Sequence, residues 1–170
     1  SRHVMERAAG LRLPFEPLTR PSESIWWNSG VPLQDLPELP RSALSGPVQD
    51  DKSAAHAALV RLIERHTGEV DAFDLRKVDG LTGSSGNMPP YTSLEEFLAG
   101  MGQRQVRIIS YKDFIKAISL PLPNFLRGHQ ISLMQANWHA SRIFWDGEQH
   151  AEAFASAIVY ARRREMEVSL

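Results

Sequence analysis

Four side chains near the end of the chain could perform metal or acid–base chemistry together. Asp146, Glu148, His150 and Glu152 alternate with other residues directly after the apolar run 143–145. Carboxylates at the end of a strand are held rigidly, and oxygen ligands suit Mg²⁺ or Mn²⁺. In this interpretation Asp146 and Glu148 bind the metal and His150 acts as acid or base. The chain would then be a metal-dependent phosphoesterase or nuclease-like enzyme.

The same residues have a simpler structural interpretation. Asp146-Gly147 is typical of a turn, while Glu148 and Glu152 are acids that favour the positive N-terminal end of a following helix. We prefer this interpretation, so the sequence predicts no catalytic residue and no cofactor.

Arginines near this segment suggest a second chemistry, the binding of phosphate. Arg142 precedes the apolar run and Arg162 begins the triplet 162–164, so both are candidates for a phosphate contact. Three consecutive helix positions span about 200° of arc, so the whole triplet cannot face one ligand. We prefer a solvated helix end, where cations favour the negative end of the helix dipole.

The histidines and the glycine-rich stretch give no motif for a ligand. None of the six histidines has the short spacing of a metal-binding motif, and His139 and His150 would join Asp146 only if the apolar runs around them pair as strands. The stretch 80–86 lacks the lysine of a phosphate-binding loop and is predicted to lie on the surface. Cysteine is absent, which excludes disulfides and thiolate zinc sites. We therefore predict no metal site.

The N-terminal part of the chain, residues 1–48, combines prolines with large apolar side chains. Seven of the eleven prolines lie there, and each removes a backbone donor and favours extended geometry. We predict an extended arm that packs on the protein's own domain, with residues 25–27 docking as a short strand or anchor. The alternative is an arm that docks on another molecule through Phe15, Trp26 and Trp27 as apolar anchors.

Apolar residues at helical spacing predict four helices in the remaining chain, residues 49–170. Three main helices are expected near 52–67, 92–100 and 149–165, and a short one at 111–118. Thr92 or Ser93 is expected to cap the second main helix, and Ser110 the short helix. One face of the helix near 52–67 is expected to lie in the core.

Alternation of apolar residues predicts the strands. A hairpin is expected from residues 131–134 and 142–145, and a closing strand from residues 166–170. Further strand candidates are residues 70–78 and 105–109. The residues 79–90, which contain several glycines and prolines, are predicted to be a loop.

The composition limits the classes of partner. The chain has 170 residues with 19 basic and 20 acidic side chains, and a formal charge of −1. Nucleic acid is therefore not a favoured partner, because no overall positive field would hold it. No apolar run approaches the roughly 18 residues that a membrane span needs, so no membrane insertion is expected.

These patterns predict a single compact α+β domain with a small mixed sheet, about three covering helices and a proline-rich N-terminal arm. They identify no known family. Because no catalytic constellation is convincing, the aromatic arm favours a small, soluble, cytoplasmic binding protein, such as an adaptor, inhibitor or immunity-type partner. The expected partner is another protein or a second copy of the chain. The alternative is the enzyme that uses Asp146 and Glu148 with Mg or Mn.

Overall fold

Short strands and helices make up the fold of this chain. The computed structural model describes residues 23–29, 32–46, 48–82, 89–128, 130–147 and 149–170. Phe15 lies outside these residues. The predicted α+β class with a small mixed sheet is confirmed.

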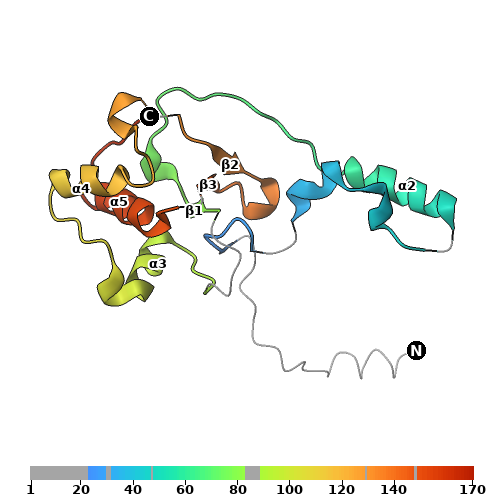
Figure 1. Cartoon of the computed structure of the whole chain (residues 1–170), viewed down its shortest axis with the longest axis horizontal. Helices are drawn as coiled ribbons and strands as arrows, with labels where there is room; N and C mark the ends of the chain where they lie inside the picture. The colour runs from blue at the N-terminus through green and yellow to red at the C-terminus, as the bar shows by residue number, and fades with distance from the viewer. Residues whose placement is uncertain (1–22, 30–31, 47, 83–88, 129, 148) are drawn as a thin grey trace, which may run out of the picture.

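Three strands form the mixed sheet in the order β1-β3-β2 (Figure 1). The central strand β3, Ile143–Trp145, has β2, Leu133–Gln135, antiparallel on one side and β1, Gly80–Leu81, parallel on the other. β2 and β3 are the predicted hairpin, in a register that places Met134 opposite Phe144. The hairpin prediction is therefore confirmed.

An N-terminal segment, residues 25–27, extends the sheet beyond β1. The backbone of Leu81 donates a hydrogen bond of 2.8 Å to the carbonyl of Ile25 and accepts one of 2.9 Å from the N–H of Trp27. Gly80 permits this close approach, because a Cβ there would overlap the carbonyl oxygen of Ile25. The segment thus docks as a short extended piece on the chain's own sheet.

The two faces of the sheet are covered differently. Neighbouring residues of a strand point to opposite faces, so Trp145 and Phe144 belong to separate packing layers. Trp145 stacks on Phe154 of the last helix, with 4.1 Å between ring centroids and 9° between ring planes. Phe144 packs in a smaller cluster with Trp27, Ala136, Met134 and Trp138.

Three of the predicted helices form as expected: α3, Leu94–Met101, α4, Tyr111–Ile118, and α5, Ala151–Arg163. The side chains of Ser93 and Ser110 cap α3 and α4, each accepting a hydrogen bond from the backbone N–H three residues later. α3 and α4 both pack on α5, whose residues are mostly buried (Figure 1). Within the described ranges, no helix is long and apolar enough to cross a membrane.

The helix predicted near 52–67 differs from its prediction. α2, Gln49–Val60, ends early, and none of its residues is buried, so the expectation of a core face is wrong. α2 packs with the 3₁₀ helix η2, Leu33–Glu38, and stands away from the sheet (Figure 1). Its alanines favour helix formation but offer little apolar surface to bury. The residues that follow form no helix or strand up to Ala72, and all of them except the half-buried Ile63 are exposed.

Two strand predictions are wrong. Residues 105–109 belong to no strand of the described sheet. Between residues 70 and 78 only Asp74 forms a bridge, with Ser169, and the 3₁₀ helix η4, Leu75–Lys77, follows it. Alternation of apolar residues marks an extended segment, but it does not supply a neighbouring strand to pair with.

The predicted closing strand and loop are each partly different from expectation. Leu170 and Phe73 exchange two backbone hydrogen bonds of 2.8 and 3.0 Å, so the closing segment lies against the residues around Asp74 and not in the main sheet. The predicted loop 79–90 contains β1, because Asp79 and Ile143 exchange hydrogen bonds that draw this segment onto β3. Residues 83–88 of that loop lie outside the described residues.

Candidate functional site

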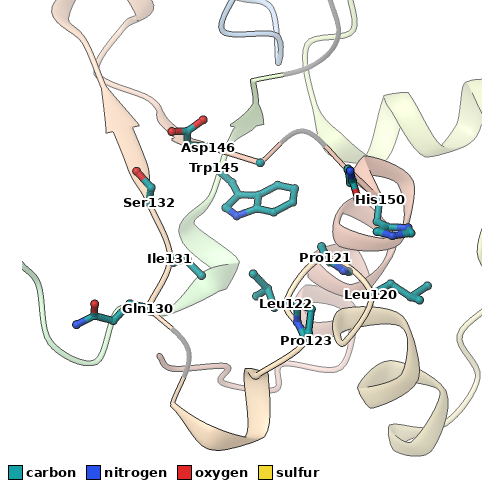
Figure 2. Close-up of a pocket in the computed structure, with 12 residues that line it drawn as sticks. Leu120, Pro121, Leu122, Pro123, Gln130, Ile131, Ser132, Trp145, Asp146 and His150 are labelled. Carbon is teal, nitrogen blue, oxygen red and sulfur yellow. The ribbon is translucent and has the colours of Figure 1, made fainter.

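Asp146 and His150 line one cavity, with the indole of Trp145 between them (Figure 2). The cavity has a volume of about 360 Å³. Ser132 lines it beside Asp146, and the turn 120–123 lines the side near His150 (Figure 2). The structure therefore brings two side chains of the alternative enzyme interpretation to the same cavity.

The arrangement of these side chains favours the structural interpretation of the cluster. Asp146 and His150 are both exposed, and no hydrogen bond joins them in the described structure. Glu148 lies outside the described residues, whereas Glu152 occupies the first turn of α5, where a carboxylate is favoured by the helix dipole. The described ranges contain no group of three His, Asp or Glu side chains that could hold a metal.

The turn after β3 is held by Thr82, the residue after β1, and by the indole beneath it. The hydroxyl of Thr82 donates to the carbonyl of Gly147 at 3.0 Å and accepts from its N–H at 3.2 Å. A Cβ on Gly147 would overlap the ring of Trp145. The shape of the cavity rim therefore depends on a glycine at this position.

His139 does not join the cavity. It is 2% exposed and packs against Trp27, with 4.7 Å between ring centroids, and against Phe144, with 5.1 Å. Phe144 and Trp145 point to opposite faces of the sheet, so His139 and His150 lie on different sides of it. The alternative in which these two histidines share a site with Asp146 is therefore not what the structure shows.

The two tryptophans proposed as binding anchors are buried in the protein's own core. Trp26 is 6% exposed and meets Phe97 edge-on at 5.2 Å, while its indole N–H donates to the carbonyl of Pro89. Trp27 is 8% exposed and packs against Phe144. These rings have little surface left for another molecule.

Arg142 binds three backbone carbonyls instead of an open phosphate site. Its guanidinium donates to Ser24 at 3.0 Å, to Thr92 at 3.0 Å and to Asp79 at 3.4 Å. The three acceptors come from the N-terminal segment, the loop before α3 and the residue before β1. A phosphate would have to displace these carbonyls from the guanidinium. In the structure Arg142 therefore joins three segments of the chain.

Arg162 is likewise bound within the protein. It donates to the carboxylate of Glu95 at 2.8 Å and to the carbonyls of Arg76 and Val78 at 3.0 and 2.6 Å. These contacts tie α5 to α3 and to the segment around η4. The guanidinium therefore has few donors left for the predicted phosphate contact.

The ion pair between Glu95 and Arg162 makes stability depend on pH in a defined window. Burial opposes ionisation of Glu95, but the hydrogen bond and charge of Arg162 outweigh it, so the pKa of Glu95 is lowered from its ordinary value of 4.5. A carboxyl whose pKa is lowered by folding stabilises the protein above the unfolded pKa, and this stabilisation is lost as pH falls through the folded pKa.

We therefore expect the free energy of unfolding to decrease on acidification from about pH 5 to pH 3, and to decrease less in Glu95→Gln than in the wild type. The two proteins should differ most near pH 7 and converge at acid pH. Urea unfolding at several pH values measures this difference. A constant difference between them across the whole range would contradict the expectation.

A second cavity, which we call the β2 groove, runs between β2 and the extended segment 68–73. Its volume is about 480 Å³. Apolar side chains line both walls, including Val70 and Phe73 on one side and Leu133 and Met134 on the other. Among the described residues that line it, Glu69 and Asp71 are the charged ones; the others are Gly68, Ala72, Gly128, Gln130, Ile131, Gln135, Ile143 and Leu170.

The backbone of β2 has one open edge along this groove. β2 is the outer strand of the sheet, and the N–H of Asp146 donates to the carbonyl of Ser132. Backbone groups in an antiparallel pair alternate between the partner strand and the opposite side. Because Ser132 and Met134 face β3, the N–H and C=O groups of Leu133 and Gln135 face the open edge.

Sequence patterns indicate β2 but not the groove beside it. Adjacent apolar residues at Leu133 and Met134 indicate a strand covered on both faces. The strand predicted over residues 70–78 overlaps the segment 68–73, but nothing in these residues indicates that the segment lies at a distance from β2. The groove depends on this spacing, which arises from the pairing of Phe73 with Leu170.

Comparison with known proteins adds one finding. A protein-family model, described as a family of unknown function, matches residues 69–170. No curated protein matches the chain, and no solved structure matches it. The matched residues contain the sheet, α3, α4, α5 and all residues of the β2 groove except Gly68, whereas α2 and residues 25–27 lie before them.

Proposed function

The chain belongs to DUF6685, a family of unknown function, and on that premise we propose that it is a non-enzymatic binding protein that holds an extended segment of a partner protein in the β2 groove. The observation that carries the proposal is the open edge of β2 inside an apolar groove. An exposed strand edge is a template for another extended chain, because its free N–H and C=O groups give a ready set of hydrogen bonds.

The lining of the groove supports a partner segment of a particular kind. Apolar side chains on both walls favour alternating apolar residues, since every second side chain of an added strand points to the same face. Glu69 and Asp71 favour a lysine or arginine in the segment, because the described lining contains no basic residue. The proposed ligand is therefore an extended, apolar and basic peptide.

The structure offers less support for the alternative, a metal-dependent phosphoesterase. Asp146 and His150 share a cavity, but the described residues supply no set of metal ligands around them. The β2 groove offers both backbone and apolar complementarity, which a binding function requires.

A selection from a random peptide library on the purified protein tests the proposal, followed by calorimetric titration of the selected peptides. Gln135→Pro removes an edge N–H while leaving the hydrogen bonds from β2 to β3 intact. Gln135→Ala is the matched control, because both variants lose the side-chain hydrogen bond to Ser141. We expect Gln135→Pro to weaken the selected peptides by about tenfold or more, and Gln135→Ala to bind like the wild type.

Charge and self-association provide two further checks. Glu69→Lys combined with Asp71→Lys should weaken basic peptides, and the loss should be smaller at high salt. Peptides that bind Gln135→Pro as tightly as the wild type would overturn the proposal. A wild-type dimer that Gln135→Pro dissociates, measured by sedimentation, would assign the edge to a second copy of the chain instead.

A further inference from the structure

A third cavity lies between the segment 105–109 and the C-terminal half of α5, and we call it the arginine pocket. Its volume is about 370 Å³, within the range of small-molecule sites. The segment joins α3 to α4 and runs past α5 (Figure 1). α5 contributes the side chains of Ser156, Val159, Tyr160 and Arg163, and Arg164, the residue after the helix, also lines the pocket.

These α5 residues share one face of the helix, because their spacing is three and four residues. Arg163 at the end of α5 and Arg164 directly after it line one wall of the pocket, and Arg107 lines the opposite wall. The described lining contains no aspartate or glutamate. Arg162 does not line the pocket, because its guanidinium donates a hydrogen bond to Glu95 on another side of the helix. Three cations around one cavity with no acid in its lining favour an anion.

Ser156 is an independent indication of a polar ligand. It is 6% exposed, and its hydroxyl has no hydrogen-bond partner in the described structure. A buried hydroxyl without a partner is unfavourable, so such groups in folded proteins usually have a partner of some kind. Ser156 lines the same cavity as the arginines, and a ligand oxygen there would supply the missing partner.

The remaining wall of the arginine pocket is apolar, and a hydrogen bond joins its two segments. The aliphatic side chains of Leu98, Val106 and Ile108 line it, together with the ring of Tyr160. The side chain of Gln105 donates a hydrogen bond to the carbonyl of Leu98, which ties the segment to the end of α3. The pocket therefore combines cations, one hydroxyl and an apolar surface.

We propose that the arginine pocket binds a small phosphomonoester. The phosphate lies among Arg107, Arg163 and Arg164 and accepts a hydrogen bond from Ser156, while the body of the ligand packs on the apolar wall. Guanidinium groups pair well with phosphate oxygens because their N–H groups donate in a fixed plane. The site is separate from the β2 groove and does not depend on the peptide-binding function proposed above.

Calorimetric titration of the full chain with AMP, adenosine and inorganic phosphate tests this site. We expect saturable binding of AMP, weaker binding of phosphate and no binding of adenosine, because only AMP offers both a phosphate and an apolar body. Arg163→Gln and Arg107→Gln should each weaken AMP by about tenfold. Arg104→Gln, the matched control, removes an equal charge from an exposed residue outside the lining and should bind AMP like the wild type.

Ser156→Ala separates a ligand role from a structural one. If the hydroxyl serves the ligand, the free variant should melt at the same temperature as the wild type or higher, and bind AMP more weakly. A lower melting temperature with unchanged AMP binding would overturn the role of Ser156. The proposal as a whole is overturned if AMP does not bind at millimolar concentration, if adenosine binds equally, if phosphate binds as tightly as AMP, or if Arg104→Gln weakens AMP as much as Arg163→Gln.

Discussion

Phe154→Ala lowers the free energy of unfolding by about 3–5 kcal/mol, the largest loss that we expect from a single substitution in this protein. Phe154 is 0% exposed and lies in α5, where it stacks on Trp145 of the central strand. Removing the ring loses buried apolar surface and leaves a cavity between the helix and the sheet. The surrounding side chains are closely packed and cannot move far enough to fill this cavity. Urea unfolding followed by circular dichroism measures the change.

Two controls make the Phe154 result specific. Phe154→Leu keeps most of the apolar volume and should cost about 1–2 kcal/mol. Leu126→Ala, at a side chain that is 71% exposed, should change stability by less than about 0.5 kcal/mol. If Phe154→Ala unfolded at the same urea concentration as Leu126→Ala, the stacking of α5 on the sheet would not be the centre of the core.

Arg142→Ala should lower the free energy of unfolding by about 2–4 kcal/mol, because one guanidinium satisfies three carbonyls in separate parts of the chain. Ser24, Asp79 and Thr92 lose a charged donor together. The partial exposure of the site allows water to replace some of these bonds, which keeps the loss below the sum of three. Urea unfolding measures this change in the free energy of unfolding.

Arg142→Lys tests whether geometry or charge matters. An ammonium group cannot reach three carbonyls in the planar arrangement that the guanidinium uses, so the lysine variant should recover only part of the lost stability. Arg127→Ala, at an exposed residue, is the matched control and should have little effect. A lysine variant as stable as the wild type would reduce the role of Arg142 to its charge.

The parts of the fold that were predictable from sequence carry their own local signals. α4 begins directly after its predicted serine cap and has a clear apolar face, and α5 combines alanines with Phe154 and Ile158 at helical spacing. The β2–β3 hairpin is predictable because two short apolar runs lie close together in the sequence, joined by a connection that contains the 3₁₀ helix Asn137–His139. In each case the signal and the structure that it indicates lie within the same few residues.

The features that could not be predicted from sequence depend on contacts between residues far apart in the chain. The apolar spacing of α2 indicates a helix correctly, but it cannot say whether a core lies beside that helix. β1 consists of Gly80 and Leu81, too few residues to show alternation, and exists because β3 pairs with it. Arg142 and Arg162 stand out in the sequence as candidate phosphate contacts, yet only the folded chain brings carbonyls of remote segments to their guanidinium groups.

The position of residues 25–27 has a consequence for how this domain is delimited. None of the described residues between Asn28 and Ala72 is buried, so the core is built from two pieces of sequence separated by a long excursion. The first piece supplies Trp26, which contacts Phe97 and bridges Leu81 in the second piece. The family match begins at residue 69 and covers only the second. The structural domain is therefore discontinuous in sequence, and a chain cut at the family boundary lacks part of its own hydrophobic core.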